Sequence, residues 1–292
     1  MDQRICIILV NYNGIRDTIE CIESIKKTTY SNYYIVVIDN ASTKGDINII
    51  KQQWDDIIII KNDENVGFAK ANNIGIKYAL EHDSDLIVLL NNDTIVNCDF
   101  LIKILDKFNA YNIEVLTCAI KYYGDKEKYW YAGGEFKWSK GYGVHYTDKR
   151  LKNEINEISF MTGCCIIARC DVFRQIMLPE DYFMYFEDVD FCLELKEKNI
   201  KMYYTPDFYI YHKVSSSTGV ESPFFVYYWN RNRIILCSKY LKKISYYRIL
   251  LISKLICSRI IKYFFYSIHQ EKDKRDAMVR GLLDGMLYKR RI

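Results

Sequence analysis

Residues 85–96 read DLIVLLNNDTIV, in which five consecutive apolar residues end in two asparagines and an aspartate before the chain turns apolar again. The apolar run is typical of a buried strand, and the polar residues mark its carboxyl end. A single carboxylate, Asp93, beside the amides of Asn91 and Asn92 offers too little charge to enclose a metal ion. It fits a partial site for a hard cation whose other ligands come from a substrate phosphate.

Strand and helix patterns alternate on both sides of this stretch through the first 120 residues. Runs rich in Val, Ile and Leu predict strands that are buried on both faces. The predicted strands are RICIILVN (4–11), YYIVVIDN (33–40), IIIIKN (57–62) and DLIVLLNN (85–92). One predicted helix carries Ile15, Ile19, Ile22 and Ile25 on one face, and others begin near Phe68 and Asp99. This order predicts an α/β fold with a mostly parallel central sheet.

The four predicted strands all end in polar residues. These ends read VNYNG (10–14), DNAS (39–42), NDENVGFAKANNIG (62–75) and NNDT (91–94). Turn chemistry alone places Asn, Asp, Ser and Gly after single strands. In parallel sheets, however, ligands bind beyond the carboxyl ends of the strands, and these residue types can hydrogen-bond a base, a ribose and a phosphate. Four such ends together predict a nucleotide site at this edge of the sheet.

The second half of the chain is less regular. Glycines between Tyr122 and Lys152 predict hairpins. The run FMTGCCIIARCDVF (160–173) predicts a strand and then a helix, and KMYYTP (201–206) predicts another strand, which FYIYHKVSSS (208–217) follows. His212 lies in the last of these, where a lone His is more often packed or solvated than bound to a metal.

Three carboxylates, Glu187, Asp188 and Asp190, follow the aromatic run of residues 182–186. Acidic residues in the first turn of a helix complement its dipole, which accounts for one or two of them. Aromatic surroundings would also partly dehydrate a carboxylate and raise its basicity. The sequence therefore indicates a carboxylate of raised basicity at the start of this helix.

The charge of the chain is concentrated at its C-terminal end. Residues 239–292 carry 14 Lys and Arg against 4 Asp and Glu, a local charge of +10, whereas residues 1–238 carry −6. Such a basic, aromatic segment favours an anionic surface. Its longest apolar run is interrupted by Lys254, Arg259 and Lys262, which argues against a spanning helix and for one that lies on a surface.

The ten cysteines form no CxxC pair, and the N-terminus shows no export signal. We therefore expect a cytoplasmic protein that is peripheral at the inner face of the cell membrane. The basic segment is expected to contact this membrane or a second subunit in a homodimer, and nucleic acid is not expected as a partner.

Seven ordered motifs resemble those of the inverting family 2 glycosyltransferases of GT-A fold, and within them the rhamnosyltransferase-like branch. They are VNYNG, DNAS, NVGFAKANNIG, LLNNDT, TGCCIIARCDVF, YFEDVDFCLEL and YHKVSSS. The resemblance spans residues 5–217, and GLLDGMLYKR near the C-terminus is similar to that branch's usual ending. It implies a GT-A domain, the fold of nucleotide-diphospho-sugar transferases, over residues 1–218. A basic, aromatic, helical extension would follow over residues 219–292.

The resemblance implies transfer of a sugar, with rhamnose as one candidate, from a dTDP- or UDP-linked donor. The acceptor would be a glycan or lipid-linked glycan in surface polysaccharide synthesis. In this family a DxD-type motif ends the fourth strand, and its last acid meets a divalent ion on the nucleotide diphosphate. Here Asn91 replaces the first acid, so Asp93 alone carries the charge, and His212 matches the family's later histidine ligand. The expected ion is Mg²⁺ or Mn²⁺.

The resemblance also implies roles for further residues. Asp188 is the expected general base, and Glu187 is expected to position the acceptor or hold the helix start. Asp39 is expected to read a pyrimidine ring, because a carboxylate accepts a hydrogen bond from the ring N3–H. The other donor contacts are expected from Asn11 and Tyr12 at the base, from Asn65, Lys70 and Asn72 at the ribose and phosphates, and from the amide of Asn92.

Three other function classes have less support in the sequence. A nicotinamide-dependent dehydrogenase needs GxGxxG after the first strand, where VNYNGI has a single Gly. A sugar-nucleotide nucleotidyltransferase is the nearer alternative, but it needs a Gly-rich, basic loop at that place. A non-catalytic carbohydrate-binding protein is favoured only by the 26 Tyr, and donor hydrolysis would distinguish it from an enzyme.

Overall fold

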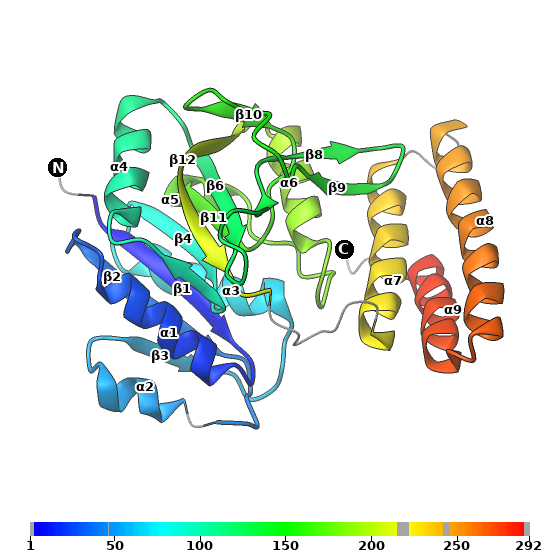
Figure 1. The fold of residues 1–292 in the computed structure, drawn as a ribbon, viewed down its shortest axis with the longest axis horizontal. Coiled ribbons are helices and arrows are strands. Elements are labelled where there is room, and N and C mark those ends of the chain that lie inside the picture. The colour runs from blue at the N-terminus through cyan, green and yellow to red at the C-terminus, as the bar shows by residue number, and fades with distance from the viewer. Residues whose placement is uncertain (1–2, 46, 215–221, 242–245, 289–292) are drawn as a thin grey trace. The chain divides into compact units, whose positions relative to one another are not determined.

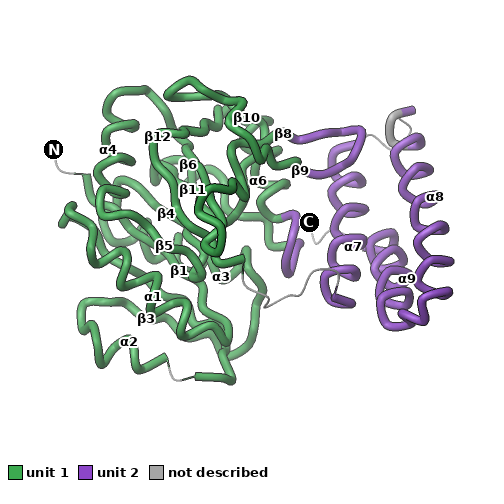
Figure 2. Tube along the Cα trace, in the orientation of Figure 1, with its two compact units in different colours: residues 1–135, 143–180, 187–214 green, residues 136–142, 181–186, 215–292 purple. Residues whose placement is uncertain are grey.

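The computed structural model describes residues 3–45, 47–214, 222–241 and 246–288. The chain divides into two compact units, which Figure 2 colours separately. The first comprises residues 1–135, 143–180 and 187–214, and the second comprises residues 136–142, 181–186 and 215–292. The domain boundary expected after Thr218 lies outside the described residues.

The first unit is built on a ten-stranded sheet (Figure 1). Its order is β10-β12-β6-β11-β4-β1-β2-β3, with β5 beside β12 and β7 beside β6. The strands are β1 (Ile5–Asn11), β2 (Tyr33–Asp39), β3 (Ile58–Lys61), β4 (Leu86–Asn91), β5 (Thr94–Val96), β6 (Val115–Tyr122), β7 (Tyr129–Tyr131), β10 (Asn156–Ile158), β11 (Cys165–Arg169) and β12 (Met202–His212). β3, β2, β1 and β4 are parallel neighbours, as are β12 and β6. The predicted mostly parallel α/β sheet is confirmed, although β11 runs antiparallel between β4 and β6.

Helices follow the first strands as predicted. In the first unit they are α1 (Ile15–Lys26), α2 (Asn48–Gln53), α3 (Phe68–Glu81), α4 (Phe100–Ala110), α5 (Cys170–Gln175) and α6 (Glu187–Glu197). α1 buries Ile22 and Ile25, two members of the predicted apolar face. α3 approaches β1 so closely that a Cβ on Gly75 would lie 2.6 Å from Cγ2 of Ile8. The parallel strands are therefore covered by closely packed helices.

The strand predicted from residues 201–206 is present and continues through His212. β12 is continuous, with a register shift between Thr205 and Tyr209 where it pairs with β6. Pro206 cannot donate a ladder hydrogen bond, and an irregularity at that point lets the strand continue past it. The glycine-rich middle of the chain does form a hairpin, in which β8 (Gly134–Lys137) pairs with β9 (Tyr142–His145).

The C-terminal part of the second unit is helical, as predicted. Its helices are α7 (Pro223–Tyr240), α8 (Tyr246–Ile268) and α9 (Lys272–Leu287). Ser222 caps α7 by accepting a hydrogen bond from the Phe225 N–H (3.2 Å), and Pro223 occupies the first turn, where a helix tolerates a missing N–H. Across the described parts of the chain, no helix combines the length and the apolar composition that a bilayer crossing requires.

Two glycines set the spacing between α7 and α9. A Cβ at Gly281 would lie 2.4 Å from the carbonyl oxygen of Tyr227, and one at Gly285 would lie 2.7 Å from that of Arg231. The hydroxyl of Tyr227 also donates to Asp284 across the same interface (2.6 Å). Only a residue without a side chain allows such a close approach of two backbones.

We predict that Gly281→Ala destabilises the second unit by about 1–3 kcal/mol, because the new methyl group overlaps a backbone carbonyl. In a free helix the same change would stabilise by up to about 1 kcal/mol. Urea unfolding followed by far-UV circular dichroism measures the difference. The control is Gly124→Ala, whose Cβ would meet no heavy atom within 4 Å. A more stable Gly281→Ala protein would contradict the close packing.

Candidate active site

The polar ends of the parallel strands lie side by side, as predicted. In the register of β1 with β2, Asn11 is the partner of Asp39. The Asn11 amide donates to Asp39 Oδ1 and to Ser42 Oγ, each at 3.0 Å. Asp39 and Asn11 are both buried. The structure therefore brings together two of the residues expected to contact the nucleotide base.

A chain of hydrogen bonds joins these residues to the motif after β4. The Thr18 hydroxyl donates to Asn11 Oδ1 (2.9 Å), and the Asn92 amide donates to the Thr18 hydroxyl (2.8 Å). Thr18 lies in α1 and is fully buried. Nothing in the sequence pointed to Thr18, because a threonine inside a helix is an ordinary residue there.

The other residues expected around the nucleotide differ in their settings. Asn65 accepts a hydrogen bond from Asn40 (2.8 Å), which ties the loop after β3 to the end of β2. Tyr12 is 49% exposed and Lys70 is also exposed, so both side chains are available to a ligand. Asn72 is buried and donates to a carbonyl of its own helix (2.9 Å). The nucleotide contacts of these residues stay predictions.

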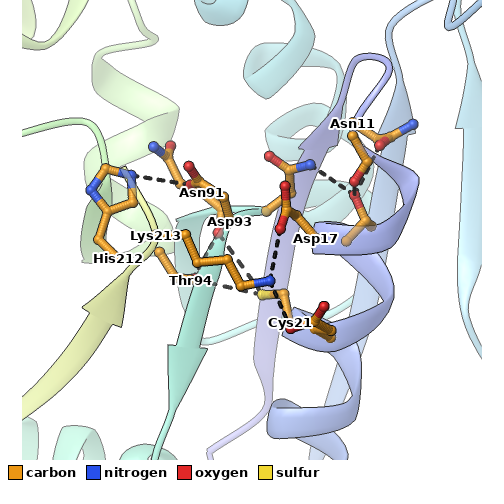
Figure 3. Close-up of polar contacts among 12 residues, drawn as sticks. Asn11, Asp17, Cys21, Asn91, Asp93, Thr94, His212 and Lys213 are labelled. Atoms are coloured by element: carbon orange, nitrogen blue, oxygen red, sulfur yellow. Dashed lines mark hydrogen bonds and ion pairs between the residues drawn. The ribbon is translucent and has the colours of Figure 1, made fainter. Parts of the chain in front are cut away.

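Asp93 and His212 meet in the structure although they are far apart in the sequence. The pairing of β5 with β12 sets Thr94 opposite His212. His212 Nε2 then lies 3.1 Å from Asp93 Oδ1 (Figure 3). The Lys213 N–H donates to the backbone carbonyl of Asp93 (2.9 Å) and reinforces the same contact. The two residues expected to bind metal are thus adjacent and buried.

This pair fits a divalent cation. A carboxylate oxygen suits Mg²⁺ and Mn²⁺, and the ring Nδ1 of His212 is buried without a hydrogen bond, so this nitrogen is not committed to a protein partner. Burial raises the pKa of Cys21 to about 12 and that of Cys164 well above its ordinary value, so both thiols favour their neutral form.

Among the residues that the structure describes, no group of three or more His, Cys, Asp or Glu could hold a metal. A cation held by Asp93 and His212 alone would need its remaining ligands from a bound substrate or water. The partial metal site expected from the single carboxylate of the NNDT motif stays a prediction.

Two residues that sequence reasoning missed support His212. The ammonium of Lys213 lies 2.7 Å from the carboxylates of both Asp17 and Glu20 in α1 (Figure 3). The ring of Trp130 packs edge-on against the His212 ring, with centroids 4.6 Å apart. Partly exposed ion pairs each contribute at most about 1 kcal/mol. Their main effect is therefore to hold the end of β12 in place beside α1.

Asp188 is held at the start of α6 by two backbone groups. Its Oδ2 accepts from the Gly163 N–H (3.1 Å) and its Oδ1 from the Val189 N–H (2.8 Å). The next residue after Gly163, Cys164, accepts a hydrogen bond from the Asn91 N–H (2.9 Å). One turn before β11 therefore touches both the candidate base and the candidate metal motif, a connection that the sequence did not reveal.

The two acids at this helix start differ in their surroundings. Burial raises the pKa of Asp188, as expected, while the N–H groups of Gly163 and Val189 oppose the increase. Burial, and next the charge of Asp188, raise the pKa of Glu187 well above its ordinary value of 4.5. Glu187 is only 6% exposed, and its Oε2 makes no hydrogen bond. Asp188 is thus a strengthened base, whereas Glu187 favours its neutral form.

Residues 6–177 match the family model described as Glycosyl transferase family 2. The chain belongs to this family and is a glycosyltransferase. It is 25% identical to the low-salt glycan biosynthesis hexosyltransferase Agl10 of Haloferax volcanii, over 82% of this chain and 78% of the relative. It is 23% identical to the dTDP-rhamnosyl transferase RfbF of Shigella flexneri, over 82% and 81% of the two chains.

A solved structure extends the likeness to the fold. The mannosyltransferase PcManGT from Pyrobaculum calidifontis, in complex with GDP-Man and Mn²⁺, superimposes with a TM-score of 0.61 at 13% identity. The match covers 98% of this chain and 88% of PcManGT. The expected GT-A fold and the resemblance inferred from the motifs are confirmed.

The buried acid Glu187 predicts a specific pH dependence of stability. Folding raises the pKa of Glu187, so its contribution to the free energy of unfolding is fully present below the ordinary pKa. This contribution is lost as the pH rises, by up to ~1.4 kcal/mol per pH unit. We expect Glu187→Gln to gain stability relative to the native chain between about pH 5 and pH 8. Urea midpoints at several pH values measure this gain, with the exposed Glu197→Gln as the control. A constant offset between Glu187→Gln and the native chain would contradict the raised pKa.

Proposed function

We propose that this chain is a metal-dependent, inverting glycosyltransferase that transfers a hexose or deoxyhexose, such as rhamnose, from a dTDP- or UDP-linked donor. The acceptor is a glycan or lipid-linked glycan in surface polysaccharide synthesis. The observation that carries the proposal is the Asp93–His212 pair, together with its connection to Asp188. The turn at Gly163 and Cys164 makes this connection, because Gly163 hydrogen-bonds Asp188 and Cys164 hydrogen-bonds the motif that contains Asp93. The relatives named for hexosyl and dTDP-rhamnosyl transfer support the choice of sugar.

On the donor side, Asp39 accepts from the pyrimidine ring, with Asn11 and Tyr12 beside the base. The ribose and phosphates lie toward Asn65, Lys70 and Asn72, and the amide of Asn92 faces the diphosphate. Asp93 and His212 hold Mg²⁺ or Mn²⁺, which when bound supplies Lewis-acid stabilisation of the charge on the leaving diphosphate. The Mn²⁺ in the PcManGT complex supports this metal requirement.

On the acceptor side, Asp188 removes the proton from the attacking hydroxyl. The hydroxyl oxygen forms a bond to the anomeric carbon as the bond from that carbon to the phosphate oxygen breaks, and its electron pair leaves with the nucleotide diphosphate. A single displacement of this kind inverts the configuration. The two N–H groups on Asp188 hold the carboxylate in one orientation, and burial keeps it basic. Glu187, in its neutral form, supports the helix start or the acceptor.

The protein acts at the inner face of the cell membrane. The local charge of +10 over residues 239–292 supports peripheral contact with the inner, anionic face of the cell membrane. An acceptor carried on a lipid would be presented at that surface.

The first test is transfer itself. A panel of dTDP-, UDP- and GDP-sugars with Mn²⁺, scored for acceptor-dependent release of nucleotide diphosphate, should give one preferred donor. Asp188→Asn should lower the rate of that reaction by about 10²- to 10⁴-fold, because the amide cannot take the proton. Donor affinity should stay within a few-fold, and circular dichroism should show a folded protein. Transfer at a near-native rate would remove Asp188 from the mechanism.

The second test concerns the metal. Asp93→Ala should abolish the Mn²⁺-dependent part of nucleotide diphosphate binding, since it removes the only carboxylate of the motif. Isothermal titration calorimetry with and without Mn²⁺ measures this part separately from the nucleotide contacts. Asp106→Ala, at an exposed position in α4, is the control. Equal Mn²⁺ dependence in both variants would disprove the metal assignment.

A further inference from the structure

The described part of α8 buries Leu251, Leu255 and Tyr266 but also exposes many apolar side chains. Its exposed apolar residues include Tyr246, Ile249, Leu250, Ile260, Ile261, Phe264 and Ile268, whereas the exposed residues 253–254 are polar. Ile268 is 77% exposed and Ile261 72%. The basic residues Arg259 and Lys262 instead line an internal cavity. A helix in water buries its apolar side and exposes its charges, so α8 is suited to an apolar medium outside and an anion inside.

The cavity lies between α7, α8 and α9 and has a volume of about 190 Å³. Phe225, Trp229 and Met278 form apolar walls, and Arg259 and Lys262 contribute the charged groups. None of the described residues that line it is an Asp or Glu. The charge of the lining is therefore entirely positive.

Two buried polar groups in the cavity wall lack hydrogen-bond partners. Asn230 is 3% exposed and donates its amide to the Val226 carbonyl (2.6 Å), but its Oδ1 makes no hydrogen bond. Tyr266 is fully buried, and its hydroxyl also makes none. Buried polar groups are almost always satisfied, so these two point to a ligand. Asn230 requires a donor and Tyr266 can donate, which fits a group that has both a hydroxyl and an anionic oxygen.

A further cation lies one turn along α7. The Nε of Arg233 is buried without a hydrogen bond. Burial, and next the positive charge of Arg259, lower the pKa of the Arg233 guanidinium. Arg233 does not line the cavity, but two guanidinium groups that influence each other in this way repel, and an anion bound beside Arg259 would reduce the repulsion.

We propose that this cavity binds the phosphate group of an anionic lipid whose headgroup carries a hydroxyl, while the outer face of α8 lies in the bilayer interface. The cavity is smaller than the roughly 300–1,000 Å³ of sites that enclose a whole ligand, so it takes a headgroup and leaves the acyl chains outside. The exposed Ile and Phe side chains of α8 are suited to the region that those chains occupy. This site is independent of sugar transfer.

The test compares two lysines of one helix in the full chain. Lys262 lines the cavity, whereas Lys254 is exposed. Lys262→Gln and Lys254→Gln remove the same charge, so diffuse attraction to an anionic surface falls equally in both. Binding is measured by co-sedimentation with phosphatidylcholine vesicles that contain or lack phosphatidylglycerol. We expect Lys262→Gln to lose at least about ten-fold in affinity for the phosphatidylglycerol vesicles, and Lys254→Gln no more than about five-fold. Lys262→Arg, which keeps the charge, should retain binding and shows that the position tolerates substitution.

Four outcomes would overturn the proposal. Equal losses in the two Gln variants would mean diffuse electrostatic attraction without a headgroup site. Equal binding to vesicles that lack phosphatidylglycerol would mean insertion of the apolar face alone. Displacement from vesicles by millimolar inorganic phosphate would identify a site for the free anion. A stable dimer that does not bind vesicles would assign the outer face of α8 to a second copy of this chain.

Discussion

The antiparallel pairing of β5 with β12 is the contact on which the candidate active site depends. β5 is only three residues long, and a strand of this length forms too few ladder hydrogen bonds to be stable alone. α1 supports it from the side, because Ser24 Oγ accepts from the Val96 N–H (3.1 Å) and Lys213 reaches back to the helix carboxylates. The chain can therefore hold Asp93 against His212 before any ligand binds, which lowers the cost of assembling a cation site.

The second unit holds residues 181–186 in an unusual backbone conformation. Residues 181–186 belong to this unit and lead directly into α6. Tyr185 and Phe186 both adopt left-handed backbone, with φ of 68° and 75°, which is unfavourable for aromatic residues. The fully buried amide of Asn232 in α7 donates to the carbonyls of Met184 and Tyr185 (2.8 and 2.9 Å) and stabilises this conformation. Within the second unit, α7 thus has a structural role for residues 181–186, apart from any surface that it contacts.

Buried acids occur at this site for different reasons. Asp188 is partly buried and hydrogen-bonded by two N–H groups, so its charged form is oriented while remaining basic. Glu187 is buried without a partner at one oxygen and favours the proton. Environment, rather than residue type, therefore separates the roles of two neighbouring carboxyl groups.

The sequence by itself determined the local features: the buried strands, the helices between them, and the polar residues at each strand end. These depend on the spacing of apolar residues and on turn chemistry, which act over a few residues. Only the tertiary structure decided which ends meet. The insertion of β11 between β4 and β6, the contact of Gly163 with Asp188 and the position of Thr18 between Asn11 and Asn92 arise from long-range packing. In α8 the sequence showed basic residues within an apolar run. Packing against α7 and α9 decided that Arg259 and Lys262 line the cavity between these helices. The rotation of a helix about its axis is set by the elements that it packs against and not by its composition.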